Sequence, residues 1–214
     1  MENRNVIELV RYQVTQNDGL NEKREQARSW ISEQPGVLCG LTLQDQSDKS
    51  AYVDLYFWRS LEEAKAAGKT AMESPRCMPF FSQISEVKLM AHFYTDQVVD
   101  TTEISNRDCV WELSVYDLVQ RADQDFDQWR PPLKKLVSAQ PGFIAWQEAI
   151  DCENTLRGLD LLSWSDAEAA NKAMEAVHPK EACRTFMSKL AGDPLFGHFI
   201  QVDGLVSKEL AQAV

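Results

Sequence analysis

The chain has 214 residues, a formal net charge of −11, 44% hydrophobic residues and 26% charged residues, an ordinary composition for a globular protein. Its length suits one large domain or two domains of about 100 residues each. The acidic balance argues against nucleic acid or an anionic membrane surface as a partner, because both attract basic surfaces. The opening residues, MENRNVIELVRYQV, contain no signal-peptide core, and no stretch approaches the roughly 20 apolar residues of a membrane span. We therefore expect a cytoplasmic protein.

The first half begins with an alternating strand pattern that contains E-L-x-x-Y, followed by a polar turn and an amphipathic helical pattern. This helix ends in QPG at residues 34–36, where Pro cannot continue a helix and Gly accepts unusual backbone angles. Two more strands follow, then an Ala- and Glu-rich helix with Ser available as N-cap, and a last strand. The strands are expected at residues 6–14, 37–44, 51–58 and 89–97.

The second half presents the same landmarks in the same order, displaced by 104 to 106 residues. QPG returns at residues 140–142, and the second Ala-rich helix has Asp as a candidate N-cap. Pro131 and Pro132 interrupt its first helical pattern, so we expect that helix to break or restart there. The strands are expected at residues 110–118, 143–150, 156–164 and 195–203. The paired residues are Glu8 and Glu112, Tyr12 and Tyr116, Asp54 and Asp160, Trp58 and Trp164, and His92 and His198.

Each half thus reads strand, helix, strand, strand, helix, strand, which is the order of a ferredoxin-like α+β domain with both helices on one face of an antiparallel sheet. The sequence predicts a tandem repeat, with a first domain at residues 1–97, a linker at 98–107 and a second domain at 108–214. Because helices cover only one sheet face, we expect the two sheets to pack together as a pseudo-dimeric barrel.

The two faces of each sheet differ in character, because alternate residues of a strand point to opposite sides. One face carries the mixed set that includes Glu8, Tyr12 and Asp54, and the other carries apolar residues such as Ile7 and Leu9. We expect the apolar face to pack on the helices. The mixed faces would then meet and line an interior pocket suited to a planar aromatic compound.

The E-x-x-x-Y pattern of the first strand, and the D-x-x-x-W of the third strand before an Ala-rich helix, resemble the dimeric α+β barrel superfamily. Within it the chain is most similar to the antibiotic biosynthesis monooxygenase group, whose members are usually single domains that dimerise. In the cofactor-independent enzymes of this group, an Asn and a Trp four residues apart on the third strand hold a polycyclic phenol for attack by oxygen. Asp54 and Asp160 replace that Asn here, while Trp58 and Trp164 match the Trp.

An ionised carboxylate cannot donate a hydrogen bond, so the expected role of the Asp is that of a base for a phenolic proton. The resemblance implies a monooxygenase that acts on an aromatic or quinol-like compound without a cofactor or metal, with a homodimer left open. The candidate catalytic residues are Asp54, Trp58, Asp160, Trp164 and Arg184, the last being a loose match to an assisting Arg. The candidate substrate-binding residues are Glu8, Tyr12, His92, Glu112, Tyr116 and His198.

Other interpretations stay open. Trp58 and Trp164 fit the hydrophobic core equally well, and histidines within strands are commonly satisfied core or rim residues. The heme-degrading branch of the superfamily ligates iron through a His on the second helix, and His178 is the candidate for that ligand. A non-catalytic module that binds a small hydrophobic ligand, for instance in a stress response, is a further alternative.

The cysteines are Cys39, Cys77, Cys109, Cys152 and Cys183. Their number is odd, and none has the spacing of zinc ligands. We therefore expect buried, reduced thiols.

Overall fold

The computed structural model describes residues 4–15, 19–96, 109–120 and 126–206. The predicted linker, 98–107, lies outside the described residues. The chain divides into two compact units, one comprising residues 1–107 and 201–214 and the other residues 108–200. Within the described ranges, no helix is long and apolar enough to cross a membrane.

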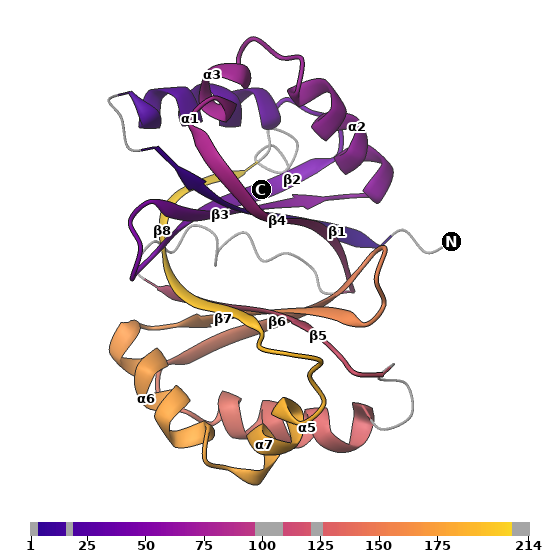
Figure 1. The fold of residues 1–214 in the computed structure, drawn as a ribbon, viewed down its shortest axis with the longest axis vertical. Helices are drawn as coiled ribbons and strands as arrows, with labels where there is room; N and C mark the ends of the chain where they lie inside the picture. Colours follow the sequence, from indigo (N-terminus) through magenta and orange to yellow (C-terminus); the bar gives the residue numbers. More distant parts are fainter. Residues whose placement is uncertain (1–3, 16–18, 97–108, 121–125, 207–214) are drawn as a thin grey trace. The chain divides into compact units, whose positions relative to one another are not determined.

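The first unit contains a four-stranded antiparallel sheet in the order β2-β3-β1-β4, with its helices on one face (Figure 1). Its elements are β1 (Asn5–Val14), α1 (Leu20–Ile31), β2 (Val37–Asp45), β3 (Ala51–Trp58), α2 (Leu61–Ala71), α3 (Met78–Phe81) and β4 (Ile84–Thr95). After α1, Gly36 of QPG adopts a φ of 83°, a value that glycine tolerates without strain. Ser60 caps α2 by accepting a hydrogen bond from the Glu63 backbone nitrogen, as the sequence predicts.

The second unit has its elements in the same order, with β6 and β8 flanking the paired strands β7 and β5. They are β5 (Val110–Asp117), α5 (Phe126–Ser138), β6 (Phe143–Asp151), β7 (Arg157–Trp164), α6 (Ala167–Val177), α7 (Glu181–Met187) and β8 (Leu195–Val206). Gly142 has a φ of 80°, and Asp166 caps α6 through the Ala169 backbone nitrogen. Residues 195–200 of β8 belong to this unit, whereas residues from 201 onward belong to the first.

The mixed α+β class and every strand expected from the sequence are confirmed. The expected break in the first helix of the second unit is wrong, because α5 runs continuously through Pro131 and Pro132. Each proline removes one backbone donor from the helix. Burial of Trp129, Leu133 and Val137 in the adjacent hydrophobic cluster offsets that loss.

The face expected to pack on the helices is also wrong, since the helices of each unit cover the mixed face of its sheet. In the first unit, Tyr12 and Tyr52 share a hydrophobic cluster with Ala27 of α1, Ala71 of α2 and Phe80 of α3. In the second unit, the corresponding cluster joins Tyr116, Leu162 and Trp164 to Trp129, Ala173 and Phe186. The mixed face of each sheet is therefore covered by the helices of its own unit. The large aromatic side chains of the mixed face pack against small residues of the helices. Strand alternation shows that a sheet has two different faces, but it does not show which of them the helices cover.

Candidate functional site

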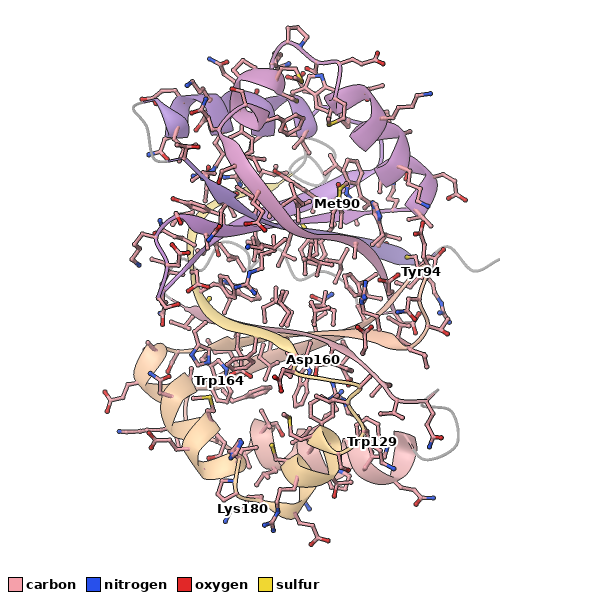
Figure 2. The ribbon with its side chains drawn as sticks, in the orientation of Figure 1. Met90, Tyr94, Trp129, Asp160, Trp164 and Lys180 are labelled. Carbon is pink, nitrogen blue, oxygen red and sulfur yellow. The ribbon has the colours of Figure 1, made fainter. Side chains whose placement is uncertain are left out.

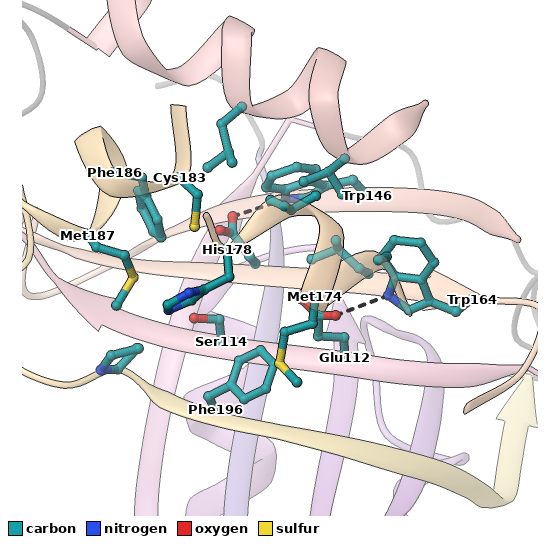
Figure 3. A pocket seen from close by; sticks show the side chains of 17 residues that line it. Glu112, Ser114, Trp146, Trp164, Met174, His178, Cys183, Phe186, Met187 and Phe196 are labelled. Atoms are coloured by element: carbon teal, nitrogen blue, oxygen red, sulfur yellow. Dashed lines mark hydrogen bonds between the residues drawn. The ribbon is translucent and has the colours of Figure 1, made fainter. Parts of the chain in front are cut away.

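A cavity of about 380 Å³ lies between the sheet and the helices of the second unit (Figure 3). The sheet contributes Glu112, Ser114, Asp160, Leu162 and Trp164 to its wall. Most of the remaining wall is apolar and comes from α5, α6 and α7. The volume and the few convergent polar groups are typical of a site for one small organic molecule.

Asp160, which is 3% exposed, is the most strongly held polar group of the pocket. The Trp146 indole nitrogen donates a hydrogen bond of 3.1 Å to Asp160 Oδ1, and Arg130 Nη2 donates to the same oxygen. Burial raises the pKa of Asp160, while Arg130 and Trp146 act in the opposite direction. Because both donors reach Oδ1, Oδ2 is the oxygen that can meet a ligand.

Arg130 lies behind Asp160 and is itself only 1% exposed. Its guanidinium sits 4.7 Å from the centre of the Trp146 ring and 5.3 Å from that of Phe186, within the range of a cation–π interaction. Arg130 Nε donates to Glu148 Oε1 at 2.7 Å, and Lys134 also pairs with Glu148. Burial raises the pKa of Glu148, but these two cations bring it below its ordinary value. The ion pairs and stacked rings thus fix Asp160 in one orientation.

Glu112 is the second carboxylate of the pocket. The Trp164 indole nitrogen donates to Glu112 Oε2 at 3.2 Å, and His198 Nε2 lies 3.3 Å from the same oxygen. Ser114 follows on the same face of β5 and is opposite Asp160 in register. Three oxygen-bearing side chains, those of Glu112, Ser114 and Asp160, therefore line the sheet side of the pocket. Figure 3 labels Glu112 and Ser114, and Figure 2 labels Asp160.

The rim of the pocket is apolar and exposed. Met174 on α6 is 43% exposed, Met187 on α7 is 40% exposed and Phe196 on β8 is 40% exposed, and all three line the cavity. His178, the C-cap residue of α6, lies in the same rim. A flat aromatic molecule could enter here past flexible thioethers.

In the first unit, the matching residues lie in the same relative positions but are more tightly packed. The Trp58 indole nitrogen donates to Glu8 Oε2 at 2.9 Å, and His92 is opposite Glu8 in register. Burial raises the pKa of Glu8 to about 7, against the hydrogen bond from Trp58. Asp54 accepts a hydrogen bond of 2.6 Å from Thr42, and burial raises its pKa as well.

Tyr56 accounts for part of this difference, because it takes the position that Leu162 takes in the second unit. A Cβ added at Gly40 would lie 2.6 Å from the Tyr56 ring, so the ring rests on the glycine. The residue 106 positions after Gly40 is Trp146, and that after Tyr56 is the smaller Leu162. The space that the Tyr56 ring fills in the first unit is therefore part of the cavity beside Leu162 in the second unit.

The pocket brings together four of the predicted site residues, namely Glu112, Asp160, Trp164 and His178. His198 holds Glu112 from the neighbouring strand, and Tyr116 packs edge-on against Phe186, with ring centroids 5.1 Å apart. Arg184 is exposed on α7 and does not contribute to the pocket wall. No group of three or more His, Cys, Asp or Glu side chains suited to a metal ion lies together in the described part of the chain.

Sequence reasoning missed Arg24 and Arg130, which are the buried cations beside Asp54 and Asp160. The signal was present, because these arginines are 106 residues apart, as are the two aspartates. The apolar positions that predict these helices do not include the arginines. Trp146 was missed for a different reason, since its counterpart in the repeat is Gly40.

No family model and no curated protein sequence matches this chain. Solved structures do match over almost the full length. An anthrone oxidase-like protein matches with a TM-score of 0.73 at 14% identity, covering 98% of this chain and 96% of that one.

Two further structures extend the comparison. A proposed monooxygenase from Fusobacterium nucleatum subsp. nucleatum has a TM-score of 0.63 at 12% identity, with 97% of this chain and 96% of that one covered. A chlorite dismutase variant from Candidatus Nitrospira defluvii, in complex with cyanide, has a TM-score of 0.62 at 8% identity, with 93% and 92% covered. The likeness to these structures establishes the fold.

Proposed function

From a chain with the fold of the dimeric α+β barrel superfamily, we propose an oxidoreductase that oxidises a hydroxylated aromatic compound with molecular oxygen in the second-unit pocket. Asp160 carries this proposal. It is a buried carboxylate with a raised pKa, fixed by Arg130 and Trp146 in the wall of an aromatic cavity. The likeness to an anthrone oxidase-like protein supports the choice of substrate class.

The chemistry requires a base and a surface on which an electron-rich ring can lie. Asp160 accepts the phenolic proton, and a raised pKa brings it closer to neutral pH, where general-base catalysis is most effective. Trp164 and Phe186 enclose the resulting anion. For an anthrone-type substrate, oxygen converts the ring methylene into a carbonyl. One oxygen atom enters the product, and the other leaves as water with the two methylene hydrogens.

The polar groups also define which molecules are favoured. Glu112 and Asp160 accept hydrogen bonds, and Ser114 can donate or accept. Among the described residues, no Lys or Arg contributes to the wall. Phenols and hydroquinones donate hydrogen bonds and carry no fixed charge. Carboxylated or phosphorylated aromatics would meet like charges beside the sheet and bind less well.

Oxygen uptake by the metal-stripped protein tests the proposal, with a panel of anthrones, quinols and naphthols as substrates. Asp160→Asn is expected to lower the rate about 10²–10⁴-fold. Asp54→Asn is the matched control, because it removes a buried aspartate from the first unit and leaves the pocket intact. Ser114→Val, which introduces the residue found at the corresponding position 10, tests the contribution of a pocket hydroxyl.

Equal rates in wild type and Asp160→Asn would refute the role of Asp160. Absence of uptake from folded protein that still binds naphthols would instead support the ligand-binding module. Heme binding is a second candidate, favoured by one observation, the presence of His178 in the pocket rim. It predicts a Soret band on addition of hemin that is lost in His178→Ala.

The same order of elements in both units supports a finer proposal about the architecture. We propose that the chain is a tandem of two ferredoxin-like repeats that together form a pseudo-dimeric barrel. The domain boundaries at residues 97 and 108 and a cytoplasmic location remain predictions from the sequence.

A further inference from the structure

The first unit contains a buried arginine whose counterpart in the second unit has two carboxylate partners. Arg24 and Arg130 occupy corresponding helix positions, and both stack on aromatic rings. The Arg24 guanidinium lies 4.2 Å from the centre of the Tyr52 ring and 5.5 Å from that of Phe80. It is only 4% exposed. The repeat thus supplies an internal reference for what such an arginine binds.

Arg130 shows how the hydrogen-bond donors of such an arginine are paired with acceptors. Its Nε donates to Glu148 at 2.7 Å, and its Nη2 donates to Asp160. Nε and Nη2 form the side of the guanidinium that matches planar oxyanions. Two carboxylates therefore occupy that side in the second unit.

Arg24 lacks the second of these carboxylates, because Thr42 stands where the second unit has Glu148. The Asp54 charge is still close enough to act on Arg24. The Thr42 hydroxyl donates to Asp54 Oδ1 at 2.6 Å, so it engages the aspartate and offers the arginine no carboxylate. Nε and Nη2 of Arg24 are buried and make no hydrogen bond to the described residues. Nη1 reaches Asn21 Oδ1 at 3.5 Å, and Tyr52 is a further hydrogen-bonding neighbour of the guanidinium.

Tyr12 lies in the same cluster and is 1% exposed. Its hydroxyl has Asp54 as a hydrogen-bonding neighbour. The Tyr12 ring stacks on Tyr52 at 5.9 Å and meets Phe80 edge-on at 5.8 Å, the two rings that Arg24 also contacts. The nearby cation Arg28 is paired with Asp203, whereas Arg24 has the charge of Asp54 nearby.

Leaving several buried donors unmet is costly, and more so when the group is charged. We propose that the Nε–Nη2 side of Arg24 binds one small carboxylate, of the size of formate or acetate, which replaces the carboxylate that Glu148 supplies in the second unit. The site is separate from the aromatic pocket and does not depend on its activity.

Thermal unfolding in acetate or formate, against chloride at equal ionic strength, tests this site. A saturable rise of about 5 °C in the unfolding midpoint is expected at ligand concentrations near 100 times Kd. Thr42→Glu should raise the midpoint without ligand and abolish the response to acetate, because it restores the internal carboxylate. Arg24→Lys keeps the positive charge but removes the planar pair of guanidinium donors, so this variant should also lose the response to acetate. It provides the test if Thr42→Glu fails to fold.

Equal shifts with acetate and chloride would overturn the proposal, because they would reflect charge screening alone. An acetate response that persists in Thr42→Glu or Arg24→Lys would place binding elsewhere and would overturn it too. If Thr42→Glu is more stable but acetate has no effect on wild type, water satisfies Arg24, and no carboxylate site exists.

Discussion

Glu8 and Trp58 form a buried pair in which the carboxylate is held by an indole donor and by no cation within the described residues. A single neutral donor only partly compensates for the loss of water around a charge. Burial therefore dominates and raises the pKa of Glu8 from 4.5 to about 7. The nearby Asp54 charge acts in the same direction. The folded protein is therefore more stable when Glu8 is protonated.

Glu8→Gln is expected to change the pH dependence of stability. A folded-state pKa above the unfolded value means that stability from this group is complete below about pH 4.5 and is lost as the pH rises through about 7. The full shift corresponds to about 3 kcal/mol in the free energy of unfolding. Gln keeps an oxygen for Trp58 and carries no charge. In urea unfolding at pH 5 and pH 8, the free energy of unfolding of the variant relative to wild type should therefore be higher at pH 8 than at pH 5.

Glu62→Gln, at an exposed position of α2, is the control for removal of one negative charge. It should change stability little at either pH. An identical pH dependence in wild type and Glu8→Gln would show that Glu8 does not titrate in this range.

The sequence identified the strand residues of both sites because strand spacing is regular and each pair recurs at 104 to 106 residues. Asp160 and Trp164, which the sequence predicts as a pair, both line the pocket. Arg130 escaped because a buried arginine is rare and is indistinguishable in sequence from a solvated one. Only the fold reveals that α5 presents it to Asp160.

At the scale of elements, the turns and caps were the most predictable features. Gly36, Gly142, Ser60 and Asp166 have the conformations or hydrogen bonds that their positions imply. The short helices α3 and α7 were not predicted separately, because a helix of four to seven residues has too few turns to show a period. Yet α7 supplies Phe186 and Met187 to the pocket, so the missed element is part of the site.

Two glycines of the first unit should respond oppositely to the same substitution. Gly40→Ala would place a Cβ 2.6 Å from the Tyr56 ring, so the ring must move, at a cost of about 1–3 kcal/mol. Gly68 lies inside α2 with nothing within 4 Å of an added Cβ, so Gly68→Ala should stabilise by about 0.5–1 kcal/mol. Urea unfolding of the two variants compares them directly. Equal effects of the same sign would mean that Tyr56 does not rest on Gly40.

At the scale of the whole molecule, the two units share the order of their elements and differ in how the helix-covered side of the sheet is filled. The first unit has Tyr52 and Tyr56 where the second has Gly158 and Leu162. Gly158 is itself covered by Tyr116, whose ring would lie 2.4 Å from an added Cβ. Such differences cannot be read from a repeat alone, because they depend on which side chains share a volume.

The exchange between Tyr56 and Leu162 predicts where aromatic ligands bind. Leu162→Tyr introduces into the second unit the ring that the first unit carries, and this ring should occupy the cavity. Binding of 2-naphthol, followed by quenching of tryptophan fluorescence, should weaken at least about tenfold, since each 1.4 kcal/mol of lost contact energy is worth that factor. Tyr56→Leu is the reciprocal control and should leave naphthol affinity at the second unit unchanged. If Leu162→Tyr folds and binds naphthol like wild type, the ligand does not use the cavity beside Asp160. Asp160 would then not be the base for such a substrate.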